Sequence, residues 1–434
     1  MPAVKYSITK RRFKMSKRII CLLLAFCMMM TVFSGCGKTI DEEPTTTTAA
    51  TDSTDATDAT ADNTDSEQTD SSASGDWTYD FDSSFISENG IEYVWERLDE
   101  DTRVNLGEVM NAIREGQVYC PLTVGFPYDE KQDFLTLVSN CCTFYVWIGT
   151  SFSVTIDGDT VIGVTINYRG IEYETDIDPI MTELEAKIQE IVASMPTDGT
   201  EFEQIKYLHD YLVLNCDYSD SEGTSPFSAY GALVEGYATC QGYADAMHLL
   251  LNRAGFETMF VTGIGTDSAV THKWNYVMCE DGHWYIIDPT WDDPQDITDP
   301  YYVGYCYFLI SDEEILKDHQ AKHDSNYYEV PVADSMDMNY FTVMGYYADN
   351  YDDACEILMS EAQTIIDSER RCLYLKCDSS ETMREIYESL KDTAYIADII
   401  AAANEAAGTS YLTDSWSRTF NDELGILTIT LKEG

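Results

Sequence analysis

The feature that most constrains the fold is a change of hydrophobic period between residues 240 and 288. The segment "CQGYADAMHLLLNRAGF" has apolar residues at helical spacing and reaches Gly255, a residue type that often ends helices. Three segments with strand-like alternation follow, "FETMFVTGIG", "HKWNYVMC" and "HWYIID". A helix followed by three closely spaced strands predicts an α+β fold with an antiparallel sheet.

Further elements are expected on both sides of this segment. They are helices at 91–116, 177–196, 200–219, 352–367 and 380–405, a hairpin at 152–173 and a final strand at 425–432. The length of 434 residues favours two or three folded units. We predict an N-terminal α+β region at 77–178, a central domain at 179–333 and a small C-terminal α+β domain at 334–434.

The overall charge and the cysteine spacing exclude several classes of protein. The formal net charge of −51 argues against binding to nucleic acid or to an anionic membrane surface. The 13 cysteines include no CxxC pair, which argues against zinc ribbons and thioredoxin-like redox sites. The neighbouring Cys141 and Cys142 are expected to pack in a core. We therefore predict no metal site and no cofactor.

The first 36 residues resemble a targeting segment. A basic stretch precedes the apolar run "IICLLLAFCMMMTVF", which is shorter than the roughly 20 residues that span a bilayer but suits a signal peptide. The run continues into "FSGC", which resembles the lipobox of bacterial lipoproteins, with Phe33 where that pattern prefers leucine. We expect Cys36 to be lipidated and the protein to be anchored to the outside of the cell membrane. An ordinary secretory signal or a short membrane anchor stays open.

Residues 37–76 are expected to be a disordered linker. The stretch is rich in Thr, Ser, Asp and Ala, and no Lys or Arg occurs between Thr39 and Glu96. Such a segment has little to bury, and its like charges favour an extended chain. The linker would join the lipid anchor to the folded part of the protein.

Three segments carry residue types that suit nucleophilic catalysis. They are "TCQGYAD" with Cys240, "THKWNYV" with His272 and "WYIIDPTWDDP" with Asp288. A cysteine nucleophile needs a base that holds it as a thiolate, and the base needs a group that orients it. Cys240 stands at the expected start of a helix, where the helix dipole favours a negative charge.

The turn between the last two strands decides whether His272 can meet Asp288. A two-residue "DG" turn would place their side chains on opposite faces of the sheet. A three-residue "EDG" loop with Gly282 in the left-handed region pairs Trp274 with Asp288 and brings His272 and Asp288 to one face. We predict the three-residue loop.

These residues and their flanks resemble the transglutaminase-like superfamily, which has a papain-related fold. The resemblance runs through "IKYLHDYLVLNCDYS", "SAYGALVEGYATCQGYADAMHLLLNRAGF", "HKWNYV" and "GHWYIIDPTWDDP", about residues 180 to 312. It implies that Cys240 opens a core helix and that His272 and Asp288 lie on neighbouring strands. It also implies catalytic roles for the three, although the family includes peptidases, amidases, acyltransferases and inactive members.

The expected activity is that of a thiol enzyme acting on amide bonds of a protein or peptide substrate. Hydrolysis is the leading hypothesis; a crosslinking acyltransferase and a non-catalytic surface binding module are the alternatives. Tyr230, Tyr237, Gly242 and Trp274 are the candidates for substrate contacts, although the aromatic residues among them would equally suit a core. A backbone oxyanion site near Cys240 is expected.

Other polar residues of this region are assigned structural or solvent-exposed positions. His209 and Asp210 are expected to form a pair on a helix surface, because no second histidine–aspartate set has the spacing of a metal hydrolase. The acidic stretch "DDPQDITDP" lacks the spaced ligands of a calcium loop and is expected to be a solvated loop containing Asp292 and Asp293.

Overall fold

The computed structural model describes most of the chain from residue 81 onward. The described residues are 81–168, 177–220, 225–265, 271–293, 302–321, 327–362, 365, 372–408, 410 and 412–433. The signal peptide, the lipidation site and the linker predicted for residues 1–76 lie outside them. Every helix in the described part of the chain is too short or too polar to cross a membrane.

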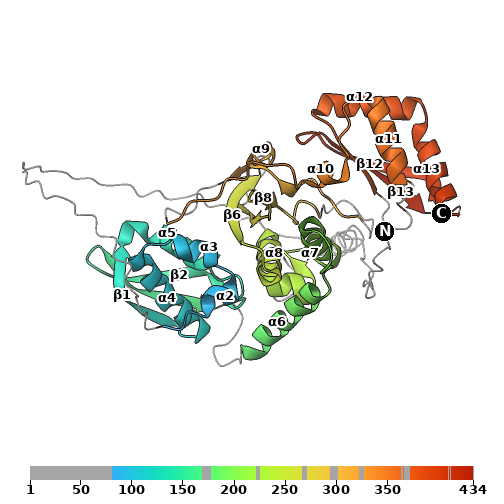
Figure 1. The fold of residues 1–434 in the computed structure, drawn as a ribbon. Coiled ribbons are helices and arrows are strands. Elements are labelled where there is room, and N and C mark those ends of the chain that lie inside the picture. The colour runs from blue at the N-terminus through green and yellow to red at the C-terminus, as the bar shows by residue number, and fades with distance from the viewer. Residues whose placement is uncertain are drawn as a thin grey trace, which may run out of the picture. The chain divides into compact units, whose positions relative to one another are not determined.

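The middle part of the chain contains a five-stranded antiparallel sheet with the strand order β10-β6-β7-β8-β9 (Figure 1). Its strands are β6 (Thr258–Gly265), β7 (Thr271–Met278), β8 (Trp284–Ile287), β9 (Phe308–Ile310) and β10 (His319–Ala321). The three central strands are those expected from the alternating pattern. A short helix, α9 (Asp312–Ile315), connects β9 to β10.

Of the helices that precede this sheet in the sequence, the last three lie nearest to it along the chain, and the last of these packs on the sheet. They are α6 (Asp178–Ala193), α7 (Glu201–Asn215) and α8 (Cys240–Ala254). Thr200 and Glu203 form a capping box that satisfies backbone donors at the start of α7. Gly255 ends α8 in the left-handed conformation, with φ of 96°. The three predicted helices are therefore confirmed, with ends shifted by a few residues.

A two-stranded parallel ladder lies just before α8. It joins β4 (Asp217–Tyr218) to β5 (Tyr237–Ala238), and a π-helical turn (Gly231–Glu235) stands between them in sequence. This ladder fixes the backbone that leads into Cys240.

The N-terminal region combines short helices with a three-stranded antiparallel sheet of order β1-β3-β2. Its elements are α2 (Phe85–Asn89), α3 (Glu92–Arg97), α4 (Glu100–Arg114), β1 (Tyr119–Pro127), a 3₁₀ turn (Tyr128–Glu130), α5 (Lys131–Asn140), β2 (Ile148–Asp157) and β3 (Thr160–Tyr168). The hairpin predicted here is confirmed as far as Tyr168. The single helix expected at 91–116 is wrong, because Asp99 caps a new helix by accepting a hydrogen bond from the Thr102 amide.

The C-terminal region adds a second three-stranded antiparallel sheet, of order β11-β13-β12. Its elements are α10 (Tyr340–Met344), α11 (Tyr351–Ala362), β11 (Cys372–Lys376), α12 (Ser380–Asp392), α13 (Tyr395–Ala406), β12 (Leu412–Asn421) and β13 (Ile426–Glu433). The long helix expected at 380–405 is divided at Ala394, whose φ of 55° interrupts the helical hydrogen bonds. Strand β13 is confirmed.

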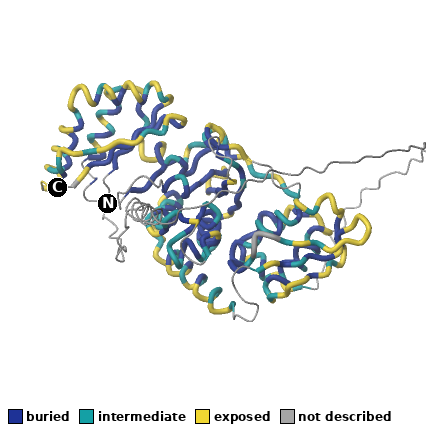
Figure 2. Tube along the Cα trace, turned by 180° about the vertical axis from the view of Figure 1, so that it is seen from behind, coloured by how far each residue is buried: buried dark blue, intermediate teal, exposed yellow. Residues whose placement is uncertain are grey.

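In the part of the chain that the structure describes, the buried residues, shown in dark blue in Figure 2, group into two hydrophobic cores. The larger core contains most of α8 and the central sheet, including Trp274 and Tyr285, which are fully buried. The second core lies among α11, α12, α13 and β13. Cys141 is buried in the larger core, as expected for a packing residue.

Candidate active site

Cys240 is the first residue of α8, and the start of this helix is left without a side-chain cap. Thr239 occupies the capping position, but its hydroxyl donates to the carbonyl of Pro226 (3.3 Å) instead of accepting from the helix. The amides of the first turn therefore stay available beside the thiol. The Cys240 side chain is partly exposed, and its Sγ lies 3.8 Å from the Thr271 carbonyl oxygen.

Gly242 allows this helix start to pack closely against the preceding loop. A Cβ at this position would stand 2.8 Å from the Ala238 Cβ and 2.8 Å from the carbonyl oxygen of Ser228. Gly242 is buried. The structure thus gives Gly242 a packing role, whereas the sequence suggested a place where substrate approaches.

The β7–β8 hairpin has the predicted register. Asn275 pairs with Ile287 and Met278 with Trp284. The Cys279 amide donates to the His283 carbonyl at 3.0 Å, which leaves the three-residue loop 280–282 between the strands. Gly282 takes the left-handed conformation with φ of 85°. The three-residue loop is confirmed, and with it the parity that brings His272 and Asp288 to one face of the sheet.

His272 and Asp288 are joined by a short hydrogen bond, with 2.5 Å between His272 Nε2 and Asp288 Oδ2. The other carboxylate oxygen, Oδ1, accepts from the backbone amides of Thr290 (3.0 Å) and Trp291 (3.3 Å). Asp288 is fully buried. Burial alone would raise the pKa of Asp288, but the His272 imidazolium outweighs it and holds that pKa below its ordinary value.

The imidazole of His272 faces the Cys240 thiol. Burial would lower the pKa of His272, yet the Asp288 carboxylate and a hydrogen bond with Cys240 raise it to about 10. Because Nε2 is taken by Asp288, Nδ1 is the nitrogen available to the thiol. An imidazolium beside a partly exposed cysteine is the arrangement that nucleophilic cysteines use.

The aromatic candidates for substrate contact occupy three different environments. Trp274 is 0% exposed and stacks on His272 with 5.8 Å between ring centroids, so of its two expected positions it has the one in the core. Tyr230 is partly buried, and its hydroxyl donates to Glu183 of α6 at 2.7 Å. Tyr237 is partly buried on β5, next to the start of α8.

Tyr218 is a neighbour of Cys240 that the sequence reasoning missed. It lies on β4 and pairs with Ala238, two residues before the cysteine. Burial raises the pKa of Tyr218, and the nearby Cys240 adds to this. The resemblance included the segment "NCDYS" that contains this tyrosine, but nothing in the local pattern indicated that it approaches the thiol.

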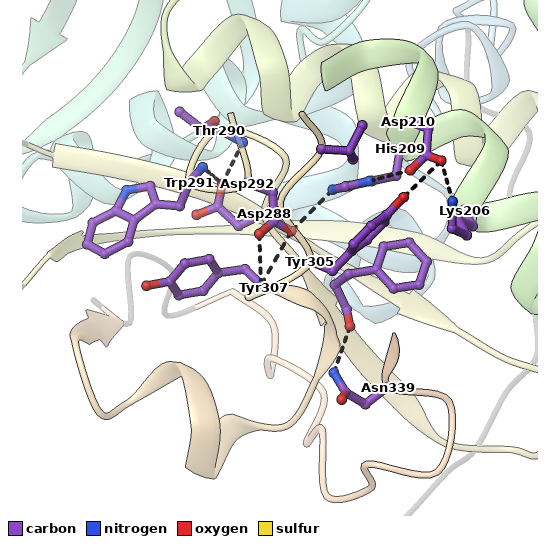
Figure 3. Close-up of polar contacts among 12 residues, drawn as sticks. Lys206, His209, Asp210, Asp288, Thr290, Trp291, Asp292, Tyr305, Tyr307 and Asn339 are labelled. Atoms are coloured by element: carbon purple, nitrogen blue, oxygen red, sulfur yellow. Dashed lines mark hydrogen bonds and ion pairs between the residues drawn. The ribbon is translucent and has the colours of Figure 1, made fainter. Parts of the chain in front are cut away.

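A set of buried polar groups supports the loop that follows Asp288 (Figure 3). His209 Nε2 lies 3.2 Å from Asp292 Oδ2, and His209 Nδ1 lies 3.2 Å from Asp210 Oδ1. Asp210 also pairs with Lys206 and accepts from Tyr305. We call His209, Asp210 and Asp292 the buried triplet, in which the Asp210 side chain is 16% exposed.

The buried triplet corrects two expectations. His209 is 0% exposed and Asp292 is 1% exposed, so neither the surface pair nor the solvated loop is correct for these residues. Asp293 is 9% exposed and accepts from the Tyr243 hydroxyl at 2.7 Å. Asp292 also accepts from the Tyr307 amide at 3.1 Å. These contacts hold the segment after Asp288 against α7, α8 and the start of β9.

Comparison with known proteins identifies a domain in the middle of the chain. Residues 188–289 match the family model of the Transglutaminase-like superfamily. No curated protein matches the sequence at a significant level.

Three solved structures are similar to parts of the chain. The first is a TGase, with 13% sequence identity and a TM-score of 0.25, and the match covers 40% of this chain and 50% of the TGase. The second is a candidate cysteine protease from Cytophaga hutchinsonii, with 16% identity and a TM-score of 0.22, and the match covers 30% of this chain and 51% of the protease. The third is the periplasmic domain of TgpA from Pseudomonas aeruginosa bound to ethylmercury, with 18% identity and a TM-score of 0.20, and the match covers 25% of this chain and 44% of that structure. The chain spans about half the length of these structures.

Proposed function

Because residues 188–289 form a transglutaminase-like domain, we propose that the chain is a thiol hydrolase acting on amide bonds of proteins or peptides. The observation that carries this proposal is the arrangement of three side chains. His272 bonds to the buried Asp288 carboxylate at 2.5 Å and faces the partly exposed Cys240 at the uncapped start of α8. In this proposal Cys240 is the nucleophile, His272 the acid and base, and Asp288 the orienting carboxylate.

The reaction begins with the Cys240 thiolate attacking the carbonyl carbon of the amide. The negative charge that develops on the carbonyl oxygen is stabilised by the free amides at the start of α8. The C–N bond then breaks as the His272 imidazolium gives its proton to the leaving amine, and an acyl-thioester remains on Cys240. Neutral His272 takes a proton from water, the hydroxide attacks the thioester, and the acid product leaves as the thiolate is restored.

Asp288 acts through His272 in this scheme. A buried carboxylate that accepts from Nε2 fixes the ring orientation and stabilises the imidazolium that forms during each cycle. The amides of Thr290 and Trp291 hold the other carboxylate oxygen, so the carboxylate cannot turn away from His272 without losing two hydrogen bonds.

The alternatives share the first half of this reaction or omit it. In a crosslinking acyltransferase a primary amine such as a lysine side chain attacks the thioester in place of water. In a non-catalytic binding module no acyl-thioester forms, although the fold is the same.

Incubation of the chain with a glutamine-containing protein, with and without a primary amine, separates these outcomes. Mass spectrometry would detect cleavage or deamidation for a hydrolase and amine incorporation for an acyltransferase, and Cys240→Ala should abolish either product. If the wild type and Cys240→Ala give the same products, the proposed activity is wrong.

We further propose that the enzyme works outside the cell, tethered through a lipid on Cys36. The basic and apolar segments before "FSGC" and the acidic linker after it support this proposal. An extended linker would let the catalytic domain reach substrates at a distance from the membrane.

A further inference from the structure

A second histidine, His319, lies beside the catalytic pair. It opens β10 and pairs with Gly265 of β6, while His272 pairs with Gly263 of the same strand. Residues two apart on a strand point to one face, so the two histidines lie on the same face of the sheet with glycines between them. A Cβ on Gly265 would come within 2.9 Å of the Trp291 ring, so glycine leaves room there for the rings above it.

The His319 ring is held by close packing and by one hydrogen bond. The side chain is 0% exposed, and its ring centroid lies 4.0 Å from that of Trp291. His319 Nδ1 lies 2.6 Å from Asp318 Oδ1, and Asp318 Oδ2 accepts from the Tyr307 hydroxyl at 2.6 Å. His319 Nε2 makes no hydrogen bond to any described residue, and Asp288 Oδ2 lies 3.8 Å from it.

The charges around the ring decide where its protons are. The charged or titratable side chains facing it in the described structure are Asp318, Asp288, His272 and Tyr307. The Asp318 carboxylate only accepts hydrogen bonds, so Nδ1 carries a proton. A neutral ring would then aim the lone pair of Nε2 at the Asp288 carboxylate, which is repulsive. A doubly protonated ring instead presents an N–H to each carboxylate.

A metal ion is the other cation that this site suggests. Ligand atoms of His272, Asp288 and His319 all lie within 4.8 Å of one another. However, His272 Nε2 and Asp288 Oδ2 are only 2.5 Å apart, whereas two ligands of a tetrahedral zinc ion lie about 3.3 Å apart. The observed spacing is that of a hydrogen bond between His272 and Asp288, so the geometry does not suit an ion that both groups would bind.

We propose that protonated His319 is a positioning residue for Asp288. Its charge holds the carboxylate from the side of β10, while His272 binds the same oxygen from β7. Asp318 and Tyr307 orient His319 in turn. This inference rests on the proposed role of Asp288. Because His319 is fully buried it does not touch substrate, so its loss should lower kcat and leave KM nearly unchanged.

The protonation state can be measured without any substrate. The chain has six histidines, so ¹⁵N-histidine labelling of the full chain gives few imidazole signals. The imidazole signals that disappear from the spectrum of His319→Gln are assigned to His319. We expect the wild type at neutral pH to give the pattern of an imidazolium with protons on both nitrogens. A neutral His319 ring would overturn the inference, and this result does not depend on whether the chain turns over amides.

Enzyme kinetics then test whether His319 positions Asp288. We expect His319→Phe and Asp318→Asn to lower kcat about tenfold with KM within about twofold of wild type, as for other partners that orient a catalytic group. His319→Gln keeps an N–H donor without the charge and should fall between wild type and His319→Phe. His283→Phe, which alters an exposed histidine on the far end of the hairpin, is the matched control.

Two results would contradict the positioning role. One is a folded His319→Phe whose kcat stays within about twofold of wild type; if that variant fails to fold, Asp318→Asn and His319→Gln give the same comparison. The other is a wild-type activity that disappears with a chelator and returns with Zn²⁺, because the three groups would then hold an ion. If instead Cys240→Ala is as active as wild type, it is the proposed function that fails.

Discussion

His209 on α7 and Asp292, which is 83 residues further along the chain, face each other in the interior with 3.2 Å between Nε2 and Oδ2 (Figure 3). His209 also contacts Asp210, so one imidazole lies between two carboxylates. Burial would lower the pKa of His209, but the two carboxylates outweigh it and raise that pKa. The His209 imidazolium thus holds α7 against the segment that follows Asp288.

Replacing His209 should therefore lower the free energy of unfolding of the domain. His209→Gln leaves the buried Asp292 carboxylate without its cation, while Asp210 keeps its ion pair with Lys206. Removing one partner of a buried ion pair costs about 3–5 kcal/mol. We expect urea denaturation to show a loss of that order in the free energy of unfolding. His283→Gln, at an exposed histidine, should change it by less than about 0.5 kcal/mol. Equal stabilities of the two variants would contradict the role of the buried triplet.

The difference in stability between wild type and His209→Gln should depend on pH. The raised pKa of His209 means that its contribution is complete below the unfolded value of about 6.5 and is lost as pH rises through the folded value. The pKa of Asp210 is lowered because Lys206 and His209 outweigh burial, so its contribution is lost as pH falls below about 3.9. The stability difference between wild type and His209→Gln should be largest between these limits and shrink on either side.

Cys240 should be the most reactive cysteine of the folded protein. It is partly exposed and faces an imidazolium, whereas burial raises the pKa of Cys120 and Cys141 to about 12 and that of Cys306 further. Only the thiolate is alkylated. A time course of iodoacetamide adducts at neutral pH, mapped by mass spectrometry, should place the first adduct on Cys240. Faster labelling of Cys141, Cys216 or Cys306 would remove Cys240 as the nucleophile.

Asp288→Asn should keep the fold and lose most of the activity. The asparagine oxygen can still accept from the Thr290 and Trp291 amides, but the neutral amide no longer stabilises the His272 imidazolium. We expect kcat/KM to fall about 10²–10⁴-fold, as when the carboxylate of other triads is removed. Asp334→Asn, at an exposed aspartate, is the control. Asp292 and Asp293 are unsuitable controls because both are buried and hydrogen-bonded.

Cys36→Ala tests the proposed anchor. The apolar run of 15 residues is too short to span a bilayer, so the lipid would be the attachment that holds the protein on the membrane. We expect the variant to move from the membrane fraction to the soluble fraction. A variant that stays in the membrane fraction with its N-terminal segment uncleaved would indicate a transmembrane anchor instead.

Much of the geometry of the candidate site could be predicted because it depends on local rules. The glycine at position 282 selects a three-residue loop, and that loop sets which strand residues share a face, so His272 and Asp288 could be placed together from sequence. The start and end of α8 likewise follow from Cys240 and Gly255. Family resemblance added the roles that we propose for Cys240, His272 and Asp288.

The supporting residues could not be predicted because their contacts join distant parts of the chain. His209 and Asp292 look like surface residues in their own segments, and only the packing of α7 against the loop after β8 buries them. His319 stands on a three-residue edge strand that shows no alternating pattern. Gly263 and Gly265 leave room on that face of the sheet for the rings of Trp274 and Trp291, but the sequence alone does not show which rings lie there.

The most direct test of the account is to trap the acyl-thioester. A peptide or small amide substrate is mixed with the full chain, the reaction is quenched in acid after a short time, and the chain is digested and mapped by mass spectrometry. We predict an acyl adduct on Cys240 in the wild type and no adduct on that peptide in His272→Ala, because the thiolate would no longer be held. An acyl group on another residue, or substrate turnover with Cys240 never modified, would show that Cys240 is not the nucleophile.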